Sequence, residues 1–114
     1  MPNQSARLDD VFQSLGDPTR RAVLERLSSG PAAVSELARP FRMALPSFSQ
    51  HLDVLENCGL VKSHKSGRIR TYRIVPRQLQ VAARWLEKRR AHWEKRLDQL
   101  DTCLTELKEN KTVG

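Results

Sequence analysis

Residues 45–75 read LPSFSQHLDVLENCGLVKSHKSGRIRTYRIV, and the spacing of their apolar side chains changes halfway along. In the first half, three apolar side chains recur at helical spacing: Phe48, Leu52 and Leu55. This spacing predicts a helix from about residue 46 to residue 58, ended by Gly59. In the second half, β-branched and aromatic side chains lie on both sides of a turn at Gly67, which predicts a two-stranded β-hairpin.

The segment upstream of this pair predicts three short helices. The first covers residues 7–15, where apolar side chains follow the helical spacing. The second begins at Pro18, because Asp17 suits the capping position and proline costs no hydrogen bond at the first helical position. The third begins near Val34 and ends at Pro40.

The segment downstream, residues 77–109, contains no proline or glycine and predicts one long helix. Such a helix would be about 50 Å long, which is more than so small a domain can cover. Its apolar side chains step by three and four residues along one side. The far end of this helix must therefore meet a partner chain, fold back or fray.

The positive charge of the chain is concentrated in the predicted hairpin. The 114 residues carry a formal net charge of +7, with a sequence pI of about 10.1. Residues 60–75 hold five basic side chains and no acidic one, whereas residues 1–59 are close to neutral. Concentrated positive charge on a hairpin indicates a polyanionic partner, most simply nucleic acid.

The order of helices, basic hairpin and long helix is that of a winged helix-turn-helix domain with an added dimerisation helix. The predicted fold class is therefore mainly α, with a small β component (α+β). We expect residues 1–76 to form the DNA-binding region, residues 77–109 the C-terminal dimerisation helix and residues 110–114 a flexible tail.

The sequence resembles the ArsR/SmtB family of bacterial transcriptional regulators, in its non-metal-sensing branch. The segments that carry the resemblance are residues 15–24, 34–38, 45–61 and 67–73. The resemblance implies a homodimer that binds a palindromic operator in double-stranded DNA, usually as a repressor. It also places the dimer contact on the first and last helices, in agreement with the long apolar seam.

The candidate dimer residues are Leu8, Phe12, Trp85, Leu86, Trp93, Leu97, Leu100 and Leu104. The two tryptophans could instead line a ligand pocket, although packing at an interface is favoured for apolar side chains at this spacing.

The candidate DNA contacts lie on the helix of residues 46–58 and on the hairpin: Ser47, Ser49, Gln50, His51, Lys65, Arg68 and Arg70. Gln50 points almost directly away from the predicted core, and an exposed glutamine can bind adenine with two hydrogen bonds. The serines suit bases or phosphates, and the basic side chains suit phosphates or a narrow minor groove. An ordinary solvated face is the alternative for the helix, and a structural hydrogen bond is the alternative for His51.

Neither a metal site nor a cofactor is expected. A thiolate metal sensor needs clustered cysteines, whereas Cys58 and Cys103 are far apart in the sequence. The chain also has no phosphate-binding glycine loop or nucleophile motif, so it is not predicted to be an enzyme. No apolar run could span a membrane, and no export signal is recognisable, so we expect a cytoplasmic protein.

The sequence therefore predicts a dimeric, sequence-specific DNA-binding regulator, most simply a repressor of its own operon. Two alternatives remain open at this level. One is a metal-responsive or redox-responsive sensor of the same fold, in which Cys58 or Cys103 is active. The other is a protein-interaction adaptor that uses its coiled-coil tail and has only vestigial DNA binding. The sequence names neither the operator nor a small-molecule effector.

Overall fold

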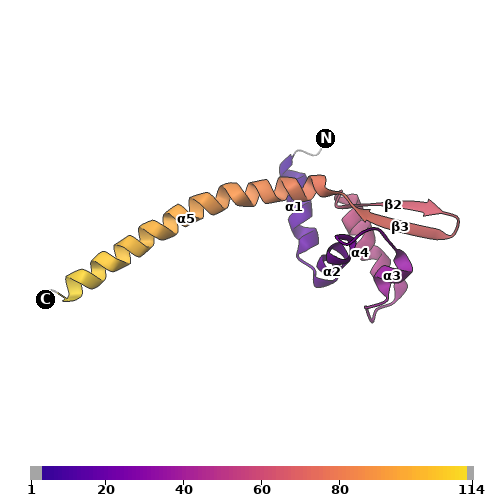
Figure 1. Cartoon of the computed structure of the whole chain (residues 1–114), viewed down its shortest axis with the longest axis horizontal. Helices are drawn as coiled ribbons and strands as arrows, with labels where there is room; N and C mark the ends of the chain where they lie inside the picture. The colour runs from indigo at the N-terminus through magenta and orange to yellow at the C-terminus, as the bar shows by residue number, and fades with distance from the viewer. Residues whose placement is uncertain (1–3, 113–114) are drawn as a thin grey trace. The chain divides into compact units, whose positions relative to one another are not determined.

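The computed structural model describes residues 4–112 and gives side-chain positions for residues 7–110. In chain order the elements are α1 (Gln4–Leu15), α2 (Pro18–Leu27), β1 (Ala32–Ala33), α3 (Val34–Ala38), α4 (Leu45–Asn57), β2 (Val61–Ser66), β3 (Ile69–Ile74) and α5 (Pro76–Thr112). This order confirms the predicted winged helix-turn-helix, with α3 and α4 as the central pair and the β2–β3 hairpin as the wing (Figure 1).

The ends of the helices follow the local sequence. Asp17 caps α2, and its Oδ2 atom accepts a hydrogen bond of 3.0 Å from the backbone N–H of Arg20. Helices α3 and α4 follow Ala33 and Ala44, neither of which makes a side-chain capping bond. Past the end of α4, Gly59 adopts a φ of +83°, a conformation that glycine adopts without strain. Helix α1 begins at Gln4, three residues earlier than the spacing predicts.

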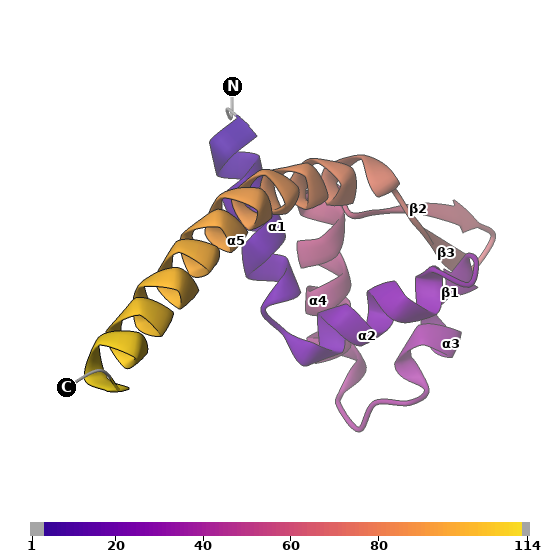
Figure 2. The ribbon, with the colours of Figure 1, turned by 60° about the vertical axis from the view of Figure 1, so that its left-hand side comes forward.

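The hairpin belongs to a three-stranded antiparallel sheet of order β1-β3-β2 (Figure 2). Strands β2 and β3 pair from Val61 opposite Ile74 to Ser66 opposite Ile69, with Gly67 in the turn at a φ of +63°. The third strand, β1, was not predicted. It consists of two alanines, which have little intrinsic preference for a strand, and they adopt this conformation because they pair with β3.

The hydrophobic core of the winged domain lies beneath α4. The predicted apolar stripe of α4 is confirmed, because Phe48, Leu52 and Leu55 are at most 1% exposed. The other buried apolar side chains come from every element around it: Val11, Val23, Leu24, Leu27, Ala32, Leu37, Leu60, Val61, Tyr72 and Ala82. Burying one large apolar side chain contributes about 1.5–3 kcal/mol, so the stripe fixes which face of α4 is left for solvent.

Helix α5 is continuous from Pro76 to Thr112 (Figure 1). It contributes to both of the compact units into which the chain divides, Met1–Ala82 and Ala83–Gly114. Its first turns belong to the first unit, where Ala82 is buried in the core. The helix continues into the segment predicted as a flexible tail, of which residues 113 and 114 lie outside the described residues. The predicted division after residue 76 stays a prediction.

Candidate nucleic-acid interface

The outer face of α4 is polar and open to solvent. Ser47, Gln50, Asp53 and Asn57 are exposed on it, opposite the buried apolar stripe. Ser49 is half-buried at the shoulder of the same helix. The face that the sequence assigns to base contacts is therefore accessible, and Gln50 presents both an amide donor and an amide acceptor outward.

The side chain of His51 is positioned by contacts with Arg20 and Asp17 of the same chain. It is half-buried, and its Nδ1 atom lies 3.1 Å from Nη1 of Arg20 and 3.7 Å from Oδ2 of Asp17. A guanidinium group can only donate, so at the shorter distance Nδ1 accepts the hydrogen bond. The ring hydrogen is then on Nε2. His51 thus has the structural hydrogen bond considered as an alternative, and it keeps one donor for another partner.

Arg20 joins three helices. Besides His51 on α4, its guanidinium donates to the backbone carbonyls of Ser14 at 2.8 Å and Gln13 at 3.2 Å, which lie near the end of α1. A cation at this position donates to carbonyls near the C-terminal end of α1 and interacts favourably with the helix dipole. The pKa of the Asp17 carboxyl lies below its usual value. The largest cause is the hydrogen bond that the carboxylate accepts from the backbone N–H of Arg20.

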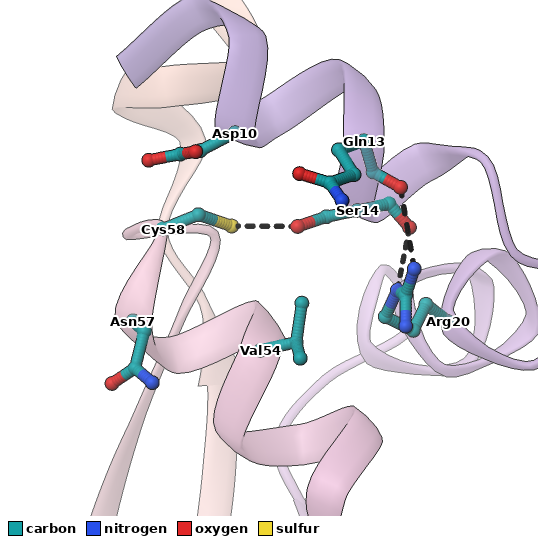
Figure 3. Close-up of a pocket in the computed structure, with 7 residues that line it drawn as sticks. All are labelled: Asp10, Gln13, Ser14, Arg20, Val54, Asn57 and Cys58. Atoms are coloured by element: carbon teal, nitrogen blue, oxygen red, sulfur yellow. Dashed lines mark hydrogen bonds between the residues drawn. The ribbon is translucent and has the colours of Figure 1, made fainter. Parts of the chain in front are cut away.

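A surface pocket of about 350 Å³ lies where α1 and α2 meet the end of α4 (Figure 3). Seven residues line it: Asp10, Gln13, Ser14, Arg20, Val54, Asn57 and Cys58. The Oγ atom of the buried Ser14 lies 3.2 Å from Sγ of Cys58, and the thiol also donates to the carbonyl of Leu55. Cys58 therefore belongs to the packing that positions α4.

The wing carries like charges directly opposite each other. Lys62 faces Arg73 across the β2–β3 ladder, and Lys65 faces Arg70. All four side chains are exposed, as is Arg68 beside the turn. Like charges directly opposite on a sheet are destabilising, so this arrangement costs stability unless an anion lies between or beside them.

A chain of hydrogen bonds connects the wing to α4. The carboxylate of Glu56 accepts from the backbone N–H of Ser63 at 3.0 Å and from its hydroxyl at 2.8 Å. The hydroxyl oxygen of Ser63 accepts in turn from Nη1 of Arg70 at 2.8 Å. Glu56 therefore fixes the orientation of the wing relative to α4. The amino-acid sequence alone does not indicate this connection, because a glutamate and a serine seven residues apart form no recognisable motif.

The wing tip and the start of α4 share one surface groove of about 360 Å³. Arg68, Ile69 and Arg70 line it from the wing, and Leu45 lines it from the first turn of α4. The remaining lining residues are Ala33, Val34 and Ser35, from β1 and the start of α3, so the groove joins the wing to the central helix pair. One ligand could contact both elements at once.

The candidate dimer residues fall into two groups. Leu8 and Phe12 are half-buried and pack against the core of their own chain. Trp85 is also half-buried, and it packs edge-on against Trp93 with ring centroids 6.5 Å apart. The other five are exposed: Leu86, Trp93, Leu97, Leu100 and Leu104, at 44–58%. The last group forms an exposed apolar face on α5.

Within residues 4–112, no three His, Cys, Asp or Glu side chains come close enough to hold a metal ion. Cys58 is half-buried and Cys103 is exposed, and both are free thiols. None of the described helices is long and apolar enough to cross a membrane.

Comparisons with known proteins match this architecture. A model described as a helix-turn-helix domain matches residues 15–64, which include α2, α3, α4 and the start of the wing. The HTH-type transcriptional regulator Rv2034 of Mycobacterium tuberculosis is 47% identical over 68 residues, or 60% of this chain. The match spans 64% of the length of that regulator. The transcriptional repressor SdpR of Bacillus subtilis is 30% identical over 69% of this chain and 88% of its own length.

Solved structures share both sequence and fold with the chain. A crystal structure of an ArsR family transcriptional regulator is 50% identical, with a TM-score of 0.76 over 82% of this chain and 97% of the other. The homodimeric winged helix-turn-helix DNA-binding domain of Mb0332 from Mycobacterium bovis, described as a possible ArsR-family regulator, is 28% identical. Its TM-score is 0.58, over 81% of this chain and 83% of the other. With this fold, and with 50% sequence identity to a regulator that it covers almost completely, the chain belongs to the ArsR family of transcriptional regulators.

Proposed function

We propose that the protein is a homodimer that binds a palindromic operator and represses transcription, including that of its own operon. The observation that carries this proposal is the pairing of an exposed polar face on α4 with a wing whose cations face one another. Two short helices followed by a wing can place the second helix in the major groove. The resemblance to SdpR, a repressor, supports the direction of regulation.

In the proposed complex α4 reads the bases. Gln50 is placed to bind an adenine through its amide oxygen and nitrogen, and Ser47 is placed to bond a base or a phosphate. Asp53 lies on the same exposed face, where its carboxylate can accept a hydrogen bond from the amino group of a cytosine. Through this contact the Asp53 carboxylate contributes to binding, whereas without it the carboxylate would only repel the DNA phosphates.

The wing and the shoulders of α4 bind the backbone. Lys65, Arg68 and Arg70 are assigned to phosphates or to a narrow minor groove, because phosphate oxygens relieve the repulsion between opposed cations. Ser49 and the Nε2–H of His51 are assigned to nearby phosphates. The Glu56–Ser63–Arg70 connection supports this assignment, since it holds the wing at a fixed position beside α4.

The dimer contact is assigned to the exposed apolar face of α5, together with Leu8 and Phe12 of α1. Six large apolar side chains are exposed on α5, the five candidates and Leu107, and an exposed apolar face of this kind is a feature of surfaces that bind another protein. The homodimeric domain of Mb0332 supports a second copy as that protein. We also propose that residues 1–76 bind DNA, that residues 77–109 dimerise, and that the protein acts in the cytoplasm, where its operator lies.

Replacing Arg68 and Arg70 with alanine tests the role of the wing. The dimer loses four phosphate contacts, so the slope of log K against log salt should become shallower by about 3–4, because each contact contributes about 0.9. Affinity for the DNA upstream of the coding region, measured by fluorescence anisotropy from low to physiological salt, should fall in parallel.

The matched control is Lys88→Ala/Lys95→Ala, which removes the same charge from exposed positions on α5. The single variant Arg68→Ala, which leaves the Ser63–Arg70 bond intact, should change the slope by about half as much. An unchanged slope in Arg68→Ala/Arg70→Ala would remove the wing from the interface and favour an adaptor that does not bind DNA.

A further inference from the structure

The loop between α3 and α4 (residues 39–44) carries two basic side chains that the proposed function does not use. Arg39 and Arg42 are both exposed, and neither forms a hydrogen bond or an ion pair with the described part of the chain. The three arginines of α2, by contrast, all donate to oxygens of their own chain. The two cations of the loop are therefore available to a partner outside the chain.

The surroundings of the loop leave its positive charge unneutralised. The sequence contains no acidic residue between Glu36 and Asp53. Glu36 already pairs with Arg26, since its Oε2 atom lies 3.2 Å from Nη2 of that arginine. Asp53 belongs to the second half of α4. Two exposed cations without a counterion of their own form a local positive potential that attracts an anionic partner.

Phe41 anchors the loop between the two arginines. Its ring packs against the buried ring of Phe48 on α4, with ring centroids 5.3 Å apart, and its backbone N–H donates to the carbonyl of Ala38 at 3.0 Å. Pro40 restricts the backbone beside it. The loop projects beyond the end of α3 and the start of α4 (Figure 2). The arginines are therefore presented from an anchored segment, so that binding requires little further ordering of the backbone.

The loop leads directly into the end of α4 that a helix-turn-helix presents to DNA. In this motif, residues near the start of the second helix reach the base edges in the major groove. The start of α4 is accessible for this purpose, because residues 44–47 are all exposed. The major groove is bordered by the two sugar-phosphate backbones, so a segment that leads into it passes beside phosphates.

Helix α3 separates the loop from the wing. Val34 and Ser35, at the start of α3, line the groove beside Arg68 and Arg70 of the wing, whereas Arg39 follows the last residue of α3. Five residues of helix span about 7–8 Å. The cations of the loop and those of the wing therefore lie on different parts of the surface and reach different phosphates.

We propose that Arg39 and Arg42 form a second phosphate-binding site, which holds the DNA backbone beside the major groove that receives α4. The ligand is the sugar-phosphate backbone of double-stranded DNA. The planar guanidinium group suits it, because its donors match the geometry of phosphate oxygens. This inference rests on the DNA binding of the proposed function, and adds to it a site that is separate from the wing.

Removing both charges tests the site. Arg39→Ala/Arg42→Ala removes four phosphate contacts from the dimer, so the slope of log K against log salt should become shallower by about 3–4. Phosphate contacts carry no sequence information, so affinity for the DNA upstream of the coding region and for random duplex should fall by the same factor. Fluorescence anisotropy over a range of salt concentrations measures both quantities.

Two control variants separate the effect of charge from an effect on folding. Arg39→Lys/Arg42→Lys keeps both charges and should keep most of the slope. Lys88→Ala/Lys95→Ala removes the same charge from exposed positions on α5 and should leave the slope unchanged. Because Arg39 and Arg42 make no hydrogen bond or ion pair with the described residues, the alanine variant should unfold at the original temperature.

Neutral methylphosphonates, substituted one at a time for phosphates of the upstream duplex, locate the site on the DNA. With the unmodified protein, affinity should fall at two separate groups of phosphates in each half-site. With Arg39→Ala/Arg42→Ala, neutralising one of these groups should cause no further loss, whereas the other group should matter as before. Arg68→Ala/Arg70→Ala should show the reverse pattern.

The outcomes distinguish this inference from the proposed function. A shallower slope together with two separate groups of phosphates supports the second site. An unchanged slope in Arg39→Ala/Arg42→Ala overturns it, and so does a loss confined to the phosphates that the wing contacts. In either case the proposed function stands if Arg68→Ala/Arg70→Ala still makes the slope shallower. A protein that does not bind the upstream DNA overturns both.

Discussion

Replacing Leu97 and Leu104 with aspartate should separate the dimer and reduce operator affinity by about 10²–10⁴-fold. The reason is that binding of the second half-site is intramolecular in a dimer, and this advantage disappears when the two DNA-binding regions separate. Both leucines are more than half exposed and lie outside the core of residues 4–82, so the fold of that region should be unchanged. Sedimentation gives the oligomeric state, and fluorescence anisotropy gives the affinity.

The control for this variant is Ala91→Asp/Gln99→Asp, which adds two carboxylates to the same helix away from the apolar seam. It should remain dimeric and bind with its original affinity. A Leu97→Asp/Leu104→Asp protein that stayed dimeric with full affinity would show that α5 does not hold the dimer together.

Replacing Gln50 with alanine should have the next largest effect. A pair of hydrogen bonds to an adenine discriminates by about 1–3 kcal/mol, and a palindrome contains the contact twice. Operator affinity should therefore fall by about 30-fold to 10⁴-fold, whereas binding to random duplex DNA, which depends on phosphate contacts, should change little. Selection of binding sites from a randomised duplex should show relaxed preference at one base pair in each half-site.

Gln99→Ala is the matched control for this variant, because it removes an exposed glutamine from α5. An equal loss on random DNA would mean that Gln50 contributes to general affinity or folding rather than to reading bases. No loss on the operator would remove Gln50 from the interface altogether.

The fold follows from the sequence wherever local signals agree. Helix α4 is predictable because its apolar stripe, its early proline and Gly59 indicate the same element, and α2 is predictable from Asp17 and Pro18. Strand β1 is not, since two alanines form a strand only through pairing with β3, which is distant in the sequence.

The candidate interface is predictable to the same extent. The exposed positions on α4 follow from the helical repeat once its buried stripe is known, and the exposed wing cations follow from a hairpin rich in charge. The connections that hold these groups in place do not follow. Arg20 reaches His51 and the end of α1, and Glu56 reaches Ser63, only after the chain has folded. Such contacts depend on tertiary structure and leave no periodic signal.

The most direct test of a dimer that reads two half-sites is a comparison of duplexes derived from the DNA upstream of the coding region. One duplex carries a complete inverted repeat, and the other has one half-site scrambled. We expect one dimer on the complete repeat, with protected half-sites centred about 10 base pairs or a multiple apart, and a large loss of affinity for the scrambled duplex. A protein that is monomeric at micromolar concentration and binds the two duplexes equally well would contradict it.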